Sequence, residues 1–88
     1  MPYITPEKRV PYDIAIENIE SIPEIGDLNY LFSILADKYI LQHGLRYEHL
    51  NAVVGAFESA KTEFQRCVVN PYEDFKRMGS APVYTSKL

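Results

Sequence analysis

Three stretches of the chain place hydrophobic residues at helical spacing, and proline or glycine separates them. In the first stretch the apolar residues that lie one helical turn apart are Tyr12, Ile16 and Ile19. Pro11 and Pro23 bound this stretch, so the pattern predicts a helix over about residues 11–22. Thr5 followed by Pro6 is typical of an N-cap and a first helical position, which predicts a short turn just before that helix.

The second stretch predicts a helix that opens at Asp27, a good N-cap residue, and ends at Gly44. Its apolar positions repeat at helical spacing and are Leu28, Leu31, Phe32, Leu35 and Tyr39. Gly44 suits the left-handed position that follows many helices, because glycine has no Cβ to clash there.

The third stretch predicts the longest helix, from about residue 46 to 70, because no proline interrupts it. Its apolar stripe, close to heptad spacing, is formed by Leu50, Val53, Val54, Phe57, Ala60, Phe64, Cys67 and Val68. Since the loop around Gly44 is short, this helix is expected to pack through the stripe against the preceding one as an antiparallel hairpin.

The end of the chain predicts a short final helix and an irregular tail. Asn70 and Pro71, with Glu73 two residues later, are typical of an N-cap, a first helical position and a capping-box partner. We expect this helix to end near Gly79 and residues 80–88 to be irregular. The predicted fold is therefore one all-α domain over residues 1–88, an antiparallel hairpin with a short helix at each end.

A second face of the long predicted helix carries small side chains, namely Ala52, Gly55, Ala56 and Ser59. Glycine inside a helix costs about 0.5–1 kcal/mol relative to alanine, so a compensating close contact is expected at this face. Two alternatives fit: the N-terminal helix packs here, or another copy of the chain does. A chain of 88 residues has a marginal core of its own, and this favours a homo-oligomer.

The amino-acid composition excludes some classes of partner and indicates a cellular compartment. The net charge of -3 lacks the basic excess that nucleic-acid binding requires, so no nucleic-acid partner is predicted. No apolar run approaches the length of a membrane helix, and the N-terminus is unlike a signal peptide. A single cysteine, Cys67, excludes a disulfide within the chain and suits a cytoplasmic location, that of the host cell if a phage encodes the protein.

No enzyme, metal or cofactor signature is found. His43 and His49 are six residues apart across a glycine, whereas two ligands on one helix face lie four apart. Cys67, in the apolar stripe, is expected to be an inert core thiol. The acidic pairs, which resemble the magnesium ligands of all-α nucleotide pyrophosphatases, are Glu17 with Glu20 and Glu24 with Asp27. A loop around Gly26 is expected to separate their members, so no catalytic residue is predicted.

Seven tyrosines and no tryptophan suggest binding instead. Lys8 and Arg9 follow a predicted helix start, where backbone N–H groups favour anions, and Tyr3 and Tyr12 flank them as surfaces for base stacking. Arg66 could add a phosphate contact from another copy. These five residues form the predicted ligand-binding set for a nucleotide-like anion, although solvated charges beside packed rings would give the same pattern.

Two resemblances extend this interpretation. The segments Met1-Pro2-Tyr3-Ile4, Asp27-Leu28-Asn29-Tyr30, Asn70-Pro71-Tyr72-Glu73-Asp74 and Val83-Tyr84 resemble a family of small uncharacterised proteins from bacteriophages and environmental sequences. The run Arg66-Cys67-Val68-Val69-Asn70-Pro71 is similar to the end of a long helix in phage proteins that sequester cyclic nucleotides from host immune signalling. The second resemblance implies a helical homo-oligomer with nucleotide pockets between subunits.

The leading functional hypothesis is a small phage-type protein that binds a nucleotide-like host signalling molecule, such as a cyclic nucleotide, as a homo-oligomer. One alternative is a protein-interaction module that binds a host or virion protein. Another is a divergent all-α nucleotide pyrophosphatase.

Overall fold

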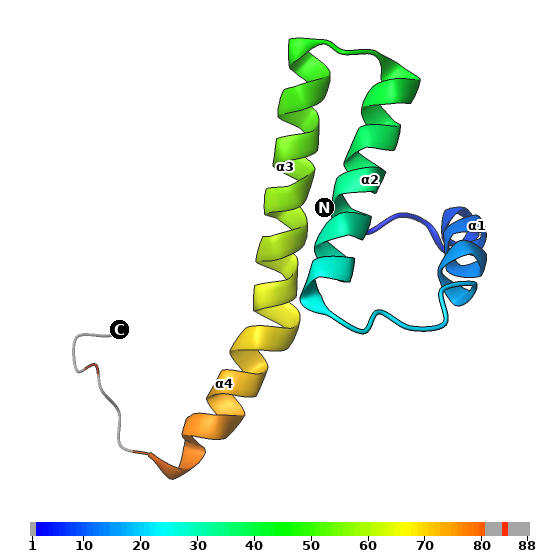
Figure 1. The fold of residues 1–88 in the computed structure, drawn as a ribbon. Coiled ribbons are helices and arrows are strands. Elements are labelled where there is room, and N and C mark those ends of the chain that lie inside the picture. Colours follow the sequence, from blue (N-terminus) through cyan, green and yellow to red (C-terminus); the bar gives the residue numbers. More distant parts are fainter. Residues whose placement is uncertain (1, 81–83, 85–88) are drawn as a thin grey trace.

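The computed structural model describes residues 2–80 and Tyr84, and every regular element within them is helical. The four α-helices are α1 (Pro6–Glu17), α2 (Ile25–His43), α3 (Tyr47–Phe64) and α4 (Asn70–Lys76). Helices α2 and α3 run antiparallel side by side, α4 continues beyond the end of α3, and α1 stands apart from the hairpin (Figure 1). The predicted all-α fold, a hairpin with a short helix at each end, is confirmed.

The hairpin turn depends on Gly44. Its φ of 105° is the one positive φ among the described residues, and its ψ is 150°. This combination is open almost only to glycine. The N–H of Gly44 donates to the carbonyl of Ile40 at 2.7 Å and completes the end of α2. The prediction of a turn that requires glycine at this position is confirmed. The ψ of Gly44 is extended, whereas a left-handed conformation was expected.

Helix α2 begins earlier than predicted. Asp27 is not its N-cap, because Glu24 holds the extended N-cap position and Asp27 lies in the first turn. The Oδ2 atom of Asp27 accepts the backbone N–H of Glu24 at 3.0 Å, so the aspartate caps the helix from inside it. The expected loop around Gly26 is therefore the first turn of α2.

The first helix was placed too late in the sequence. It starts at the Thr5–Pro6 signal, includes Pro11 and ends at Glu17. Pro11 was expected to break the helix, because an internal proline removes a backbone hydrogen bond and crowds the preceding turn. The chain retains the helix through Pro11 and becomes irregular well before Pro23.

The long C-terminal run shows a second error. Asn70 has helical φ and ψ of -65° and -45°, so it is not an N-cap that restarts the chain. Instead a π-helical turn over Gln65–Val69 joins α3 to α4 without a break. A π turn is wider than an α turn, and we attribute it to Pro71, whose ring would otherwise press on the carbonyl of Cys67. A 3₁₀ turn at Arg77–Gly79 follows α4.

The predicted irregular tail lies mostly outside the described residues. Ser80 has an extended backbone and Tyr84 belongs to no helix or strand, as expected. None of the helices in the part of the chain that the structure describes is long and apolar enough to cross a membrane.

A single copy builds no closed core. None of the described residues is buried, and the chain exposes 8309 Å² with a radius of gyration of 17.6 Å. A compact chain of this size exposes about 5,300 Å² and has a radius of gyration of about 12 Å. The apolar side chains that are half-buried are Ile19, Leu28, Leu31, Ala36, Ile40, Val53 and Val69.

Candidate functional site

An open apolar groove lies between α2 and α3. We call it the hairpin groove; it is lined by Phe32, Leu35, Ala36, Tyr39, Val53, Ala56, Phe57 and Ala60. Its volume is about 220 Å³. Leu35 and Phe57 remain 61% and 45% exposed, so large side chains from both helices face water on this side of the hairpin. Such a surface suits an apolar partner rather than a charged ligand.

The predicted packing of α3 is only partly correct. The large members of the apolar stripe were expected to pack on the preceding helix, yet those that stay exposed are Leu50, Val54, Phe57, Phe64 and Val68. Of the small residues, Ser59 is half-buried and Ala56 lines the groove beside α2. Val53 of the stripe is also half-buried and lines the groove with Phe57 and Ala60, so residues of both faces of α3 border α2.

Gly55 still lacks a close neighbour. A Cβ built on it would meet nothing within 4 Å outside its own helix. Helix α1, one of the two candidates for packing on the face that includes Ala52 and Gly55, contacts no other described helix. Within a single chain, nothing described compensates for the glycine.

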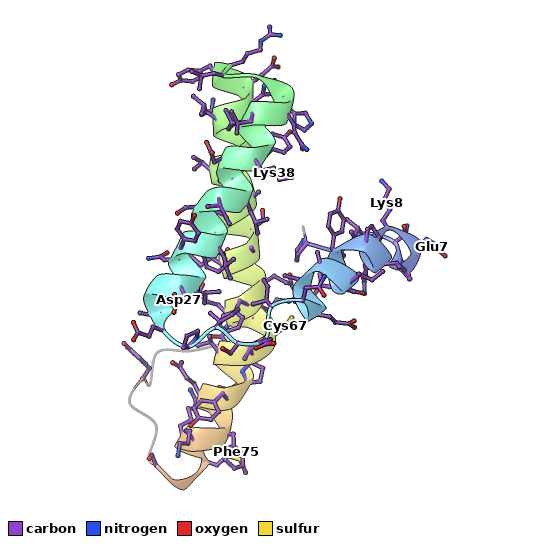
Figure 2. All side chains as sticks on the ribbon, turned by 45° about the vertical axis from the view of Figure 1, so that its right-hand side comes forward. Glu7, Lys8, Asp27, Lys38, Cys67 and Phe75 are labelled. Atoms are coloured by element: carbon purple, nitrogen blue, oxygen red, sulfur yellow. The ribbon has the colours of Figure 1, made fainter. Side chains whose placement is uncertain are left out.

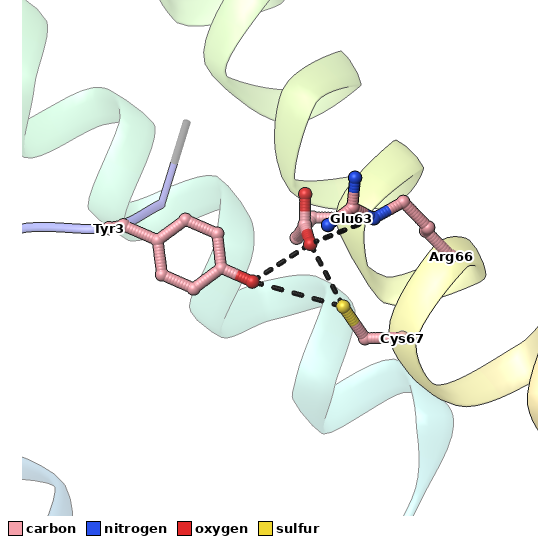
Figure 3. A network of polar contacts seen from close by, with 4 residues as sticks. All are labelled: Tyr3, Glu63, Arg66 and Cys67. Atoms are coloured by element: carbon pink, nitrogen blue, oxygen red, sulfur yellow. Dashed lines mark hydrogen bonds and ion pairs between the residues drawn. The ribbon is translucent and has the colours of Figure 1, made fainter.

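A polar cluster ties the N-terminal segment to the end of α3. We call it the anchor cluster, and it consists of Tyr3, Glu63, Arg66 and Cys67. Figure 3 shows the Tyr3 ring reaching from the N-terminal segment to α3, where its O–H donates to Oε1 of Glu63 at 2.8 Å. The thiol of Cys67 donates to the same oxygen at 2.9 Å, and Nε of Arg66 lies 3.5 Å from it.

The anchor cluster shifts the acid–base equilibria of Tyr3 and Glu63. The hydrogen bond to Glu63, with a smaller contribution from Cys67, raises the pKa of Tyr3 from 10.0 to about 12. Hydrogen bonds from Cys67 and then Tyr3, with the nearby charge of Arg66, hold the pKa of Glu63 below its ordinary value of 4.5. Both shifts favour a neutral phenol bonded to a charged carboxylate.

The π turn positions the anchor cluster. Arg66 and Cys67 lie within it, while Glu63 lies one turn earlier, near the end of α3. Cys67 is exposed and hydrogen-bonded, so the expectation of an inert core thiol is wrong. Sequence analysis missed Glu63, although its positions three and four residues before Arg66 and Cys67 place all three on one helix face.

The five residues of the predicted ligand set do not meet within one chain. Tyr3 and Arg66 both contact Glu63, a carboxylate that opposes anion binding. Arg9 donates from Nε to the carbonyl of Ile4 at 2.9 Å. Lys8 lies at the end of α1 far from Cys67 (Figure 2), and Tyr12 is also on α1, exposed to solvent. A pocket that combined these residues would need more than one copy.

A third cluster lies at the hairpin turn and brings the two histidines together. The rings of His43 and His49 are 5.9 Å apart between centroids, and His43 stacks on Tyr39 at 4.0 Å. Nδ1 of His43 contacts the carbonyl of Tyr39, and Nδ1 of His49 contacts that of Gly44. The spacing argument considered one helix only, whereas these side chains come from two.

No group of three or more side chains that could together hold a metal ion occurs in residues 2–80 or at Tyr84. Two histidines alone are fewer ligands than structural or catalytic zinc sites use. The hairpin groove and the anchor cluster are therefore the candidate functional features of the described residues.

Comparison with known proteins yields one match. A family model described as "Domain of unknown function (DUF6899)" matches residues 1–83. No curated protein and no solved structure matches the chain.

Proposed function

The chain belongs to the family of the domain of unknown function DUF6899, and we propose that it is a self-assembling helical binding protein whose folded unit contains more than one copy. The family description names no activity, so the proposal rests on the hairpin groove and on the exposed apolar surface around it.

The exposed area is the observation that carries this proposal. The accessible surface of 8309 Å² is about 3,000 Å² more than a compact monomer of this size exposes. An obligate homodimer interface buries about 2,000–5,000 Å² in total, or about 1,000–2,500 Å² on each copy. The surplus is large enough to supply such an interface.

The position of the apolar side chains supports a copy of the same chain as the partner. The hairpin groove and the large stripe residues beside it, such as Phe64, form one face that runs along both helices. Two copies that each cover this face of the other would bury the same residues on both sides, as a two-fold interface does. They would form a helical bundle, and the hydrophobic core that a single copy lacks would lie between them.

The experiment compares the mass and stability of two full-length variants. Phe57→Glu places a charge in the hairpin groove, while Asn51→Glu adds the same charge on an exposed part of α3 that does not line it. Multi-angle light scattering should give an oligomer for the parent chain and for Asn51→Glu. Phe57→Glu should give a monomer with a lower melting temperature. An unchanged mass and melting temperature for Phe57→Glu would contradict the proposal.

The nucleotide hypothesis becomes a narrower proposal within this one. Since Lys8, Arg9 and Arg66 do not converge in one chain, an anion pocket would have to form between copies. Calorimetry of the parent oligomer with cyclic dinucleotides and trinucleotides tests it. Binding should be weakened by Lys8→Ala combined with Arg9→Ala, and a panel that gives no heat would leave protein–protein binding as the remaining function.

A further inference from the structure

Helix α1 is a helix without a packing partner. It contacts no other described helix, and Figure 1 shows it projecting sideways from the hairpin. It has 12 residues and contains Pro11. Isolated helices of this length are marginal in water even when they are rich in alanine, and an internal proline weakens them further. A stable α1 therefore requires a surface on which to pack.

Both ends of the segment that carries α1 are fixed near the open end of the hairpin, where α2 begins and α3 ends. At one end Tyr3 bonds to Glu63 on α3, and at the other Glu24 is capped by Asp27 on α2. The chain between these points extends away from its own hairpin. We call residues 4–23 the arm. An arm that is fixed at both ends and carries an unpacked helix in its middle is well placed to meet another molecule.

The arm carries exposed apolar side chains that fit within the length of the hairpin groove. Val10 and Ile14 lie one turn apart on one face of α1, Tyr12 and Ile16 lie one turn apart on the opposite face, and all four are more than half exposed. From Val10 to Ile14 the helix rises about 6 Å, whereas from Phe32 to Tyr39 along the groove α2 rises about 10 Å, so this face of α1 fits within the length of the groove. A helix that presents apolar residues at a spacing of four is the usual occupant of a groove between two helices.

We propose that α1 of one copy packs in the hairpin groove of a second copy, and that the exchange is reciprocal. This inference rests on the proposed self-association and adds which segment of the partner covers the groove. The same chain supplies both an unpacked apolar helix and an unfilled apolar groove, so a pair of copies satisfies both at once. Exchange of an identical element is also a low-cost route to a symmetric dimer.

The test uses disulfide cross-linking between full-length single-cysteine variants. Cys67→Ser removes the native thiol and keeps a donor for Glu63. In that background, Ile14→Cys places a thiol on α1 and Leu35→Cys places one in the groove. Equal amounts of the two variants are unfolded together, refolded to allow exchange, oxidised, and separated by mass spectrometry without reductant.

The expected product is a covalent heterodimer joined through positions 14 and 35. Ile14→Cys mixed with Asn51→Cys is the matched control, because position 51 does not line the groove, and it should give at least about ten-fold less heterodimer. Equal yields in the two mixtures would overturn the inference. So would a cross-link that forms within one chain when Ile14→Cys and Leu35→Cys are combined in the same molecule.

A second measurement separates this inference from the proposed self-association. Ile14→Asp should weaken dimerisation at least about ten-fold in sedimentation equilibrium, because a large apolar side chain would lose its buried site. Glu7→Gln, on the same helix, should leave dimerisation nearly unchanged. An oligomeric parent whose dissociation constant is unaffected by Ile14→Asp would refute arm exchange and leave self-association intact, whereas a monomeric parent would refute both.

Discussion

The α2–α3 hairpin and the arm that carries α1 are positioned by different kinds of interaction. The hairpin depends on neighbours in sequence: a glycine at its turn, a capping aspartate at its start and half-buried side chains along its length. Apart from its connection to α2, the arm is held through Tyr3, whose O–H donates to Glu63, 60 positions along the chain, and lies 3.8 Å from Sγ of Cys67. Contacts within one chain thus hold the hairpin, whereas the proposed exchange would give the arm a surface on which to pack.

The largest expected effect is that of replacing Gly55. It shows whether the face of α3 that carries Gly55 is buried against another copy or open to water. If another copy packs here, Gly55→Leu overpacks the contact and destabilises the protein by about 1–3 kcal/mol. If the face is open to water, the same change improves helix propensity and stabilises it by about 0.5–1 kcal/mol. Chemical denaturation at two protein concentrations determines the sign. We expect destabilisation, and a stabilised variant would contradict an interface at this face.

The next effect tests the local signal that forms the hairpin. Gly44→Ala should destabilise the protein by about 1 kcal/mol or more, because alanine rarely adopts a φ of 105°. The cause is backbone strain, since a Cβ at Gly44 would have its nearest neighbour at 4.0 Å. Gly26→Ala is the matched control, because a Cβ there meets nothing and φ is not positive. Thermal unfolding should show a loss for position 44 and no loss for position 26.

A smaller effect should be confined to the arm. Tyr3→Phe removes the hydroxyl that bonds to Glu63 and leaves the ring in place. We expect trypsin to cleave after Lys8 and Arg9 faster than in the parent, while the hairpin keeps its helical circular dichroism. Tyr47→Phe, at the exposed start of α3, is the control and should cleave like the parent. Equal cleavage of all three proteins would show that the hydroxyl does not hold the arm.

The smallest effect is the pH dependence of the same contact. Because the pKa of Tyr3 is raised to about 12, its contribution to stability is complete below pH 10 and is lost between pH 10 and about 12. Glu63 has a lowered pKa, so its contribution is complete above pH 4.5 and is lost as the pH falls below that value. In an alkaline absorbance titration, the parent should show a late phenolate component that Tyr3→Phe removes and Tyr12→Phe retains.

Much of the hairpin could be predicted from sequence, because the signals that form it are local. The apolar spacing of α2, the stop at Gly44 and the long proline-free run of α3 all led to the observed antiparallel pair. Helix boundaries at prolines were less predictable. Pro11 lies inside a helix, and Pro71 follows a π turn instead of a new N-cap, because in both places the chain continues as a helix despite the proline.

The candidate sites depend on contacts that sequence spacing does not specify. Tyr3 was predicted to stack on a nucleotide base, yet in one chain it donates to Glu63, a residue that the sequence analysis did not consider. The packing of α3 was only partly predicted, since Val53 of the apolar stripe is half-buried but so is Ser59 of the small face, while Phe64 stays exposed. An apolar stripe shows that a surface must be covered, but it does not show whether the same chain or another copy covers it.

The mass of the unmodified chain in solution tests self-assembly most directly. Sedimentation equilibrium across a range of concentrations should give a multiple of the monomer mass, with the melting temperature rising as concentration rises. A single-copy mass at every concentration, together with a radius of gyration near the ~12 Å of a compact chain of this length, would contradict it. In that case the helices would close on themselves and the hairpin groove would need no partner.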